Sequence, residues 1–145
     1  MNTILGSDGA GIIESIGEGV DPNYIGREVI INPNINWGDD PKKQSQTYHI
    51  LGMPTNGTFA EYVTVNSDRI HAKPDHLSWP EAASLPLGGL TAYRALFTHG
   101  KVKANDTVLI SGVGGGVAQF AFLFAKAAAA NVYVTSSSDD KIDFC

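Results

Sequence analysis

The stretch VLISGVGGGVA at 108–118 constrains the fold of the second half of the chain more than any other part of the sequence. The apolar run Thr107–Ile110 predicts a buried strand, and the glycines that follow it predict a tight turn. Residues from Gly116 to Ala130 are apolar nearly all round, so they predict a helix that is covered on more than one side. The next run, NVYVTS at 131–136, predicts a second strand. Together these segments predict a strand–helix–strand unit, the βαβ motif, of about 30 residues.

The glycine turn between the strand and the helix can be interpreted as a phosphate-binding site. Glycines permit positive φ and let the backbone approach a pyrophosphate closely, and the N-terminus of the following helix offers free N–H groups. We therefore expect the pyrophosphate of a dinucleotide to bind at Gly112, Gly114, Gly115, Gly116 and Val117. The alternative is a plain strand-to-helix turn in another kind of α/β protein.

The end of the second strand gives a further indication about the cofactor. NAD-specific sites usually carry Asp or Glu there to bind the ribose hydroxyls, whereas this chain has Thr135, Ser136 and Ser137 at that place, followed by Lys141. Because hydroxyls do not repel a 2′-phosphate and a lysine attracts it, Ser136, Ser137 and Lys141 are predicted to surround the adenosine phosphate, which favours NADP(H) over NAD(H). The alternative, which is compatible with the first, is that Ser136–Ser138 cap a helix whose first turn holds Asp139 and Asp140.

The first half of the chain has a different pattern, with short β-like runs broken by Gly, Pro, Asn and Asp. In the run TFAEYVTV, apolar residues occur on both faces, which suits a small closed barrel or a sandwich. The segment 32–57 is long and polar, and we expect it to be a functional or disordered loop. The predicted strands are GIIESIG, REVIIN, TFAEYVTV and RIHA, at 11–17, 27–32, 58–65 and 69–72.

Helical signals begin at Ser78. The sequence SWPE predicts a capping box between Ser78 and Glu81, with Pro80 at a position that a first helical turn tolerates. Pro86 is predicted to end this first helix and to begin another through LGGLTAYRALF at 87–97.

Composition and charge exclude several classes of function. The net charge is −5 and no basic run occurs, so no nucleic-acid partner and no membrane partner is expected. Cys145 is the only cysteine, which excludes a disulfide framework and a cysteine-based zinc site within this chain. The N-terminus does not resemble a signal peptide, and the apolar run at 120–125 is too short to span a bilayer. We therefore expect a soluble, cytoplasmic protein.

Several blocks of this sequence resemble, in the same order, those of the medium-chain dehydrogenase/reductase superfamily. The chain is most similar to its quinone-oxidoreductase-like and zinc-type alcohol-dehydrogenase-like members. The blocks are GSDGAGIIESIGEGV at 6–20, GTFAEYVTV at 57–65, KPDHLSWPEAASLPLGGLTAYRAL at 73–96 and VLISGVGGGVAQFAFLFAKAAAANVYVTSSSDDK at 108–141.

The resemblance implies a β plus α/β fold. It implies a partial GroES-like β-barrel with its connecting helices over residues 1–99, and then the first βαβ unit of a Rossmann domain over residues 100–145. In the family, NAD(P)H binds in the cleft between these domains. Members of the family are much longer, so the chain is expected to be a fragment that begins inside the barrel and ends after the second Rossmann strand. A homodimer is expected only for the full-length protein, through the edge of its Rossmann sheet.

This chain departs from the zinc-dependent members at the positions where those members hold zinc. Ser7 stands where they have His, Leu87 stands where they have Cys, and the segment 32–57, which matches their structural-zinc lobe, contains no cysteine. Zinc needs three or four converging N, S or O ligands. The chain is therefore predicted to resemble the zinc-independent branch and to hold no metal. Its histidines lack ligand spacing and are expected at the surface or in the barrel; they are His49, His71, His76 and His99.

By this resemblance, the chain is predicted to belong to an NADPH-dependent oxidoreductase, either a quinone or enone reductase or an alcohol dehydrogenase-like enzyme. Such an enzyme transfers hydride between the nicotinamide and a small-molecule carbonyl substrate. Thr91 is expected to approach the nicotinamide, and the alternative for it is an ordinary helix threonine. Tyr48 and Asn34 are candidate donors to the carbonyl oxygen, and Asp8 could order the cleft. Two other interpretations stay open, a nucleotide-binding module without catalysis and an inactive fragment.

Overall fold

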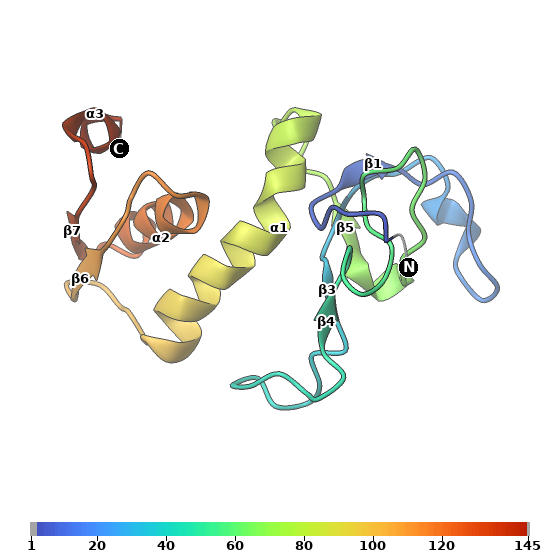
Figure 1. The fold of residues 1–145 in the computed structure, drawn as a ribbon, viewed down its shortest axis with the longest axis horizontal. Helices are drawn as coiled ribbons and strands as arrows, with labels where there is room; N and C mark the ends of the chain where they lie inside the picture. The colour runs from blue at the N-terminus through green and yellow to red at the C-terminus, as the bar shows by residue number, and fades with distance from the viewer. Residues whose placement is uncertain (1–2, 145) are drawn as a thin grey trace. The chain divides into compact units, whose positions relative to one another are not determined.

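The chain divides into two compact units, Met1–Leu87 and Gly88–Cys145, and the computed structural model describes residues 3–144 of it. Short antiparallel sheets make up the first unit, and a parallel pair of strands with helices makes up the second (Figure 1). The boundary falls inside helix α1 (Trp79–Tyr93). The domain boundary that the resemblance implies, after residue 99, remains a prediction.

The first unit contains a three-stranded antiparallel sheet in the order β1–β2–β5. Val29 and Ile31 of the central strand are buried, so one face of β2 belongs to the core of this unit. Three of the predicted strands are thereby confirmed in part, since β1, β2 and β5 span Ala10–Ile12, Glu28–Ile31 and Ile70–Ala72. Strand β1 begins one residue before the predicted strand 11–17 and ends five residues before its predicted end. Single turns of 3-10 helix, η1 and η2, lie at Pro22–Tyr24 and Ser67–Arg69.

The polar segment 32–57 contains more regular structure than a loop. It folds back on itself as an antiparallel pair, β3 (Asn34–Ile35) and β4 (His49–Ile50). The N–H of Leu51 donates to the carbonyl of Pro33 at 3.0 Å, and both residues are buried. This hairpin is therefore anchored at its base, where the chain leaves and re-enters the body of the unit.

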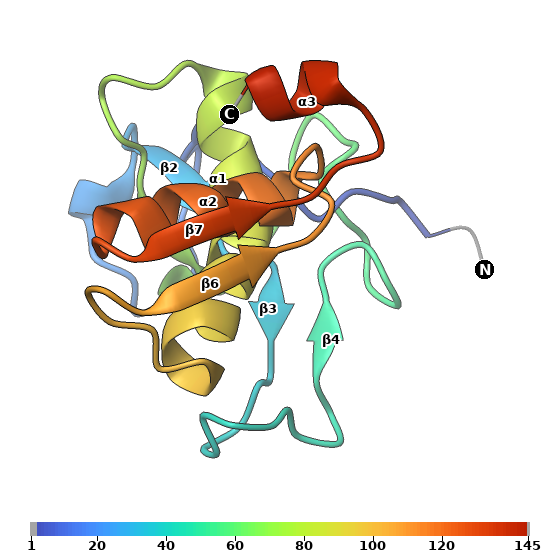
Figure 2. The same cartoon turned by 90° about the vertical axis from the view of Figure 1, so that its left-hand side faces the viewer.

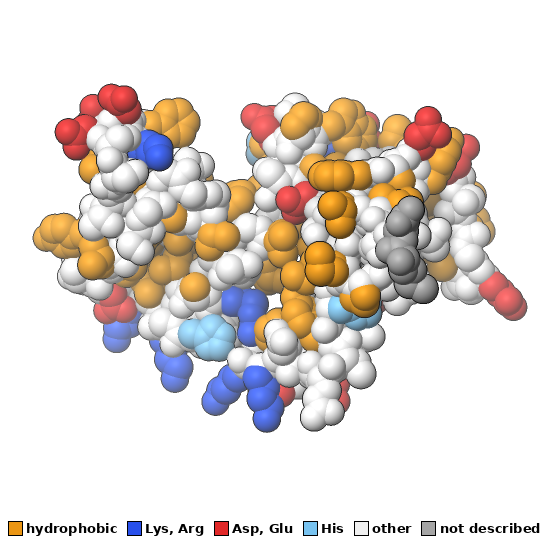
Figure 3. Space-filling view, in the orientation of Figure 1, with side chains coloured by type: hydrophobic (Ala, Val, Ile, Leu, Met, Phe, Trp, Pro, Cys, Tyr) orange, Lys and Arg blue, Asp and Glu red, His pale blue; other side chains and the backbone are white. Residues whose placement is uncertain are grey.

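The predicted strand at 58–65 does not form, and this prediction was wrong. Backbone hydrogen bonds join only its start to the N-terminal segment, with Phe59 N–H donating to the Leu5 carbonyl at 2.9 Å. Beyond Phe59 the segment has no backbone partner within residues 3–144. Alternating apolar residues make a strand only where a neighbouring strand completes the ladder. Instead Phe59 and Tyr62 are 78% and 75% exposed, and hydrophobic side chains gather on this unit, at the right of Figure 3.

Helix α1 continues through Pro86, so the predicted break at this residue was also wrong. Pro86 has no N–H to donate to the carbonyl of Ala82, which costs the helix one hydrogen bond. Ala82 and Ala92, on either side of the proline, are fully buried, and packing of this kind stabilises a helix more than its intrinsic propensity does. The chain then continues as a wider π-helical segment, η3 (Arg94–His99).

The start of α1 is held by side chains of the helix itself, of the segment before it and of strand β2. The carboxylate of Glu81 accepts hydrogen bonds from the N–H and the hydroxyl of Ser78, at 2.9 and 2.6 Å. One of the two hydrogen bonds of the predicted capping box is thus confirmed, the one from the Ser78 N–H to the Glu81 carboxylate. The other does not form, because the Ser78 hydroxyl bonds this carboxylate rather than a backbone N–H. Lys73 Nζ lies 3.1 Å from Glu28 Oε2 and 4.9 Å from the ring centroid of Trp79. Because the Lys73 side chain is only 7% exposed, these contacts tie β2 to the helix start.

The second unit is the βαβ unit that the sequence predicts. Strands β6 (Thr107–Ile110) and β7 (Asn131–Val134) pair in parallel, and α2 (Gly116–Ala127) packs against both (Figure 2). A short helix, α3 (Asp139–Asp143), follows. Helix α2 ends three residues earlier than predicted, and Ala129 has a φ of 57°, which a continuing α-helix does not allow.

The core of the second unit lies between α2, the two strands and η3. Leu96, Ile110 and Ala125 are its buried centre. Phe124 of α2 stacks on Phe120 and meets the ring of Tyr93 edge-on, so α2 is covered on a second side as predicted. Its Leu123 and the outer face of the strand pair are exposed. Within residues 3–144, no helix has the length and apolarity that a membrane crossing requires.

The hydrogen bonds at the start of α1 make its stability dependent on pH. The bonds from Ser78 hold the pKa of the Glu81 carboxyl below its ordinary value of 4.5. A carboxyl whose pKa is lower in the folded state stabilises the fold above its unfolded pKa, and this contribution is lost as the pH falls through the folded pKa. We therefore expect Glu81→Gln to lower the urea midpoint at neutral pH and to have a vanishing effect in acid.

The matched control is Glu18→Gln, at an exposed carboxyl outside the helix. An effect of Glu81→Gln that stays constant from pH 7 to strong acid would contradict this account of the helix start.

Candidate cofactor site at the glycine turn

The turn between β6 and α2 contains one residue in a backbone conformation that favours glycine. Gly112 has a φ of 66°, in the left-handed region that favours glycine. The N–H of Gly115 donates to the carbonyl of Gly112 at 3.0 Å, which closes the turn. Val113, which is fully buried, donates its N–H to the carbonyl of Thr135 at 3.0 Å. The turn is therefore fixed directly to the end of β7.

The N-terminus of α2 faces this turn without a side-chain cap. Gly115 is the N-cap residue and makes no side-chain capping bond, and the first bond back to it comes from Gln119 N–H at 2.9 Å. By helix geometry, the N–H groups of the first turn, including those of Gly116 and Val117, have no acceptor inside the helix. They carry the positive end of the helix dipole, which stabilises a bound anion.

A hollow of about 430 Å³ lies beside the turn, and it brings together most of the residues that the sequence predicts for the cofactor. Gly116 and Val117 lie next to it in the exposed first turn of α2 but do not line it. Thr135 also lines it; the sequence places this residue at the same hydroxyl-rich strand end, but it is not among the predicted cofactor contacts. The lining residues are Gly112, Gly114, Gly115, Thr135, Ser136, Ser137 and Lys141.

Among residues 3–144, Lys141 is the one ionisable residue that lines this hollow. Its stem lies against the turn, since a Cβ added to Gly114 would stand 2.7 Å from Lys141 Cδ. Asp139 and Asp140 lie in the first turn of α3 and do not line the hollow. The alternative that the serines cap α3 is supported in part, because Ser138 is the N-cap residue and its N–H donates to the Ser136 hydroxyl at 3.4 Å, although the Ser138 side chain makes no capping bond. The hollow therefore has the charge and the hydroxyl groups that suit a phosphorylated ligand.

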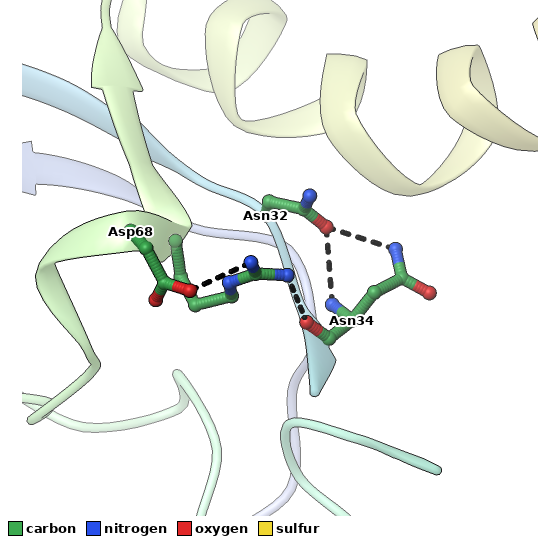
Figure 4. A network of polar contacts seen from close by, with 4 residues as sticks. Asn32, Asn34 and Asp68 are labelled. Atoms are coloured by element: carbon green, nitrogen blue, oxygen red, sulfur yellow. Dashed lines mark hydrogen bonds and ion pairs between the residues drawn. The ribbon is translucent and has the colours of Figure 1, made fainter. Parts of the chain in front are cut away.

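The predicted substrate-side residues of the first unit lie in one hydrogen-bonded network. Tyr48 donates its hydroxyl to Asn34 Oδ1 at 2.5 Å, and the ring of Trp37 meets that of Tyr48 edge-on. Asn34 Nδ2 donates to Asn32 Oδ1 at 2.9 Å, which sets the orientation of the Asn34 amide. Arg69 then donates to the Asn34 carbonyl at 3.0 Å (Figure 4). Thr91, the predicted nicotinamide contact, is an exposed residue of α1 in the second unit.

Ser7 and Asp8 occupy a tightly packed backbone junction in the first unit. A Cβ on Gly52 would stand 2.6 Å from the carbonyl oxygen of Gly6, so the two segments meet backbone to backbone. The Ser7 hydroxyl donates to the Leu51 carbonyl at 2.8 Å. Burial raises the pKa of the Asp8 carboxyl above its ordinary value of 3.8. Among the residues placed by the structure, which leave out Cys145, no three His, Cys, Asp or Glu side chains are grouped to hold a metal ion.

Comparison with known proteins identifies the family. Residues 1–75 match the alcohol dehydrogenase GroES-like domain. The chain belongs to this family. Its GroES-like character confirms the predicted β plus α/β fold class, although the short sheets of this chain form no closed barrel within residues 3–144.

Relatives of this GroES-like chain include dehydrogenases and reductases. A zinc-type alcohol dehydrogenase-like protein of Schizosaccharomyces pombe is 42% identical over 146 residues, which cover 99% of this chain and 42% of that protein. A crotonyl-CoA carboxylase/reductase of Cereibacter sphaeroides is 37% identical, over 97% of this chain and 35% of that protein. The solved structure of an NAD-dependent alcohol dehydrogenase has a TM-score of 0.91 and 36% identity, over 98% of this chain and 43% of its own. The chain thus spans less than half the length of these relatives.

The geometry of the turn predicts which of its glycines tolerate a side chain. Gly112→Ala places a Cβ in a left-handed conformation and should cost about 1 kcal/mol in the free energy of unfolding. The matched control, Gly116→Ala, adds a Cβ that meets no atom within 4 Å, at a helix position where alanine is preferred to glycine. Urea denaturation of both variants checks this prediction, and equal losses of stability would contradict it.

Proposed function

We propose that this chain is the dinucleotide-binding and substrate-side part of an oxidoreductase that uses NADP(H) to reduce a small-molecule carbonyl compound. The hollow at the glycine turn carries this proposal. It combines glycines, hydroxyl side chains and one lysine with an uncapped helix N-terminus. Relatives named as dehydrogenases and reductases support the reaction class.

The chain's own residues would hold the dinucleotide in two places. Backbone N–H groups of Gly116 and Val117 would bind the pyrophosphate, because the turn leaves room for its oxygens at Gly112, where an added Cβ would meet no atom within 4 Å. Ser136, Ser137 and Lys141 would bind the phosphate on the adenosine ribose. When bound, the nicotinamide supplies the hydride, and the protein contributes binding and orientation.

The choice of NADP(H) over NAD(H) rests on the charge of the strand end. A carboxylate there would repel a 2′-phosphate, and the hollow is lined by hydroxyl groups and Lys141 instead. The similar structure named as an NAD-dependent alcohol dehydrogenase binds the other dinucleotide by its name, so the preference in this chain needs its own measurement.

We also propose that the reaction proceeds without zinc, as the sequence predicts. The residues at the two zinc-ligand positions of the zinc-dependent members support this proposal. The Ser7 hydroxyl donates a hydrogen bond to the Leu51 carbonyl, and the Leu87 side chain has no atom that could bind a metal. Thr91 and Tyr48 remain the predicted contacts of the nicotinamide and the substrate. We also propose that a full-length protein containing this chain forms a homodimer.

Dinucleotide titration of the chain tests the cofactor proposal. We expect NADPH to bind more tightly than NADH, because only NADPH carries the phosphate that Lys141 would attract. Lys141→Gln should weaken NADPH binding about tenfold, or about 1.4 kcal/mol, and should leave NADH binding nearly unchanged. Isothermal titration calorimetry gives both affinities.

The matched control is Lys103→Gln, at an exposed lysine of the same unit that does not line the hollow. No binding of either dinucleotide to the wild-type chain would refute the proposed function, and an equal loss for NADPH and NADH would refute the assignment of Lys141 to the 2′-phosphate.

A further inference from the structure

The glycines of the turn differ in what surrounds them, and Gly114 is the one that lies against a side chain of α3 within residues 3–144. Cβ atoms added at Gly112 and Gly116 would meet no atom of the described residues within 4 Å, and one added at Gly115 would meet the carbonyl oxygen of Gly112 at 3.5 Å. A Cβ added at Gly114 would stand 2.7 Å from Cδ, 3.4 Å from Cγ and 3.5 Å from Cε of Lys141. The stem of this lysine therefore lies along the space that a side chain at position 114 would fill.

The backbone of Gly114 does not itself require glycine. Gly112 has the left-handed conformation that favours glycine, but the φ of Gly114 lies outside that region. A Cβ at position 114 is thus opposed by the stem of Lys141 and not by backbone strain. Because the atoms in its way belong to a flexible four-carbon side chain, such a Cβ would displace the lysine before it displaced the turn.

The contact with Gly114 determines where the charge of Lys141 lies. Both residues are exposed, and both line the hollow at the turn together with Ser136 and Ser137. The ammonium is one bond beyond Cε, so a stem that lies on the turn holds the ammonium beside the turn as well. A lysine side chain loses rotamer freedom when it binds a phosphate. A stem that already lies against the backbone has less of this freedom to lose, so the contact favours binding of a phosphate.

We propose that Gly114 is a positioning residue for cofactor specificity. It makes room for the stem of Lys141 and so holds the ammonium where it binds the phosphate that distinguishes NADPH from NADH. This inference rests on the proposed function, in which Lys141 binds that phosphate. The role differs from that of Gly112, which the conformation of the turn requires, and from that of Gly116, whose N–H would bind the pyrophosphate. A side chain at position 114 therefore acts through Lys141 and weakens the binding of NADPH more than that of NADH.

The first test observes this contact by NMR in the chain without a dinucleotide. Nuclear Overhauser effects are measured between the α-protons of Gly114 and the side-chain methylenes of Lys141, whose signals Lys141→Ala assigns by removing them. We expect these effects in the wild-type chain, because the lysine stem lies against Gly114. In Gly114→Ala, the methylene signals of Lys141 should shift as the stem moves away. Absence of the effects from the wild-type chain would overturn the proposal, and this measurement does not depend on the folding of any variant at position 114.

The second test measures the affinities for NADPH and NADH by titration calorimetry, for the wild-type chain, Gly114→Ala, Lys141→Ala and the double variant. Gly114→Ala should lower the affinity for NADPH about threefold to tenfold more than that for NADH, because the displaced lysine must be ordered again when the phosphate binds. In the Lys141→Ala chain no lysine stem lies at position 114, so adding Gly114→Ala should leave the ratio of the two affinities unchanged.

The matched control is Gly17→Ala, at an exposed glycine of the first unit where an added Cβ would meet no atom of the described residues within 4 Å, and it should change neither affinity. Equal losses for both dinucleotides in Gly114→Ala, or a changed ratio that persists in the double variant, would overturn the proposal, because the glycine would then serve the pyrophosphate or the turn itself. If the wild-type chain binds neither dinucleotide, the proposed function fails and this role of Gly114 fails with it. Tight binding of NADPH without the proton contacts between Gly114 and Lys141 would refute the role of Gly114 alone.

Discussion

The parallel pairing of β6 with β7 is the constraint on which the candidate cofactor site depends. Register places Ile110 opposite Val134, so the two strands end side by side. Beyond these ends, Val113 N–H donates to the Thr135 carbonyl, and Thr135 N–H donates to the Ile110 carbonyl, both at 3.0 Å. These bonds bring the glycine turn and the hydroxyl-rich segment together at one edge of the pair. In parallel sheets, ligands bind at this edge because the helices that follow the strands begin there.

The first unit depends on close backbone packing more than on regular strands. Gly52 meets Gly6 where a side chain would not fit, and hydrogen bonds from Ser7 and Thr58 complete this junction. It holds the backbone of Asp8 against Thr58, at the start of the segment 58–65.

Local sequence patterns predicted the second unit well because its contacts lie close together in the sequence. The apolar run, the glycines and the helix that follow one another in VLISGVGGGVA correspond to β6, the turn and α2. The strand predicted at 58–65 depends on a distant partner, and its pattern alone could not reveal that pairing stops at Phe59. The helix end predicted at Pro86 was wrong for a related reason. The sequence reveals the hydrogen bond that a proline removes, but it does not reveal the burial of Ala82 and Ala92 on either side of it.

The site shows the same division. Glycines and serines near the βαβ turn were predicted because their spacing along the chain places them together, whereas the contact between Gly114 and the Lys141 stem depends on how α3 packs on the turn, which no spacing reveals. The most direct test of the central claim maps NADPH binding on the backbone amides of the chain by two-dimensional NMR. The account predicts that the largest shifts fall at residues 112–117 and 135–141. Saturating NADPH that shifts no amide in these two segments would contradict it.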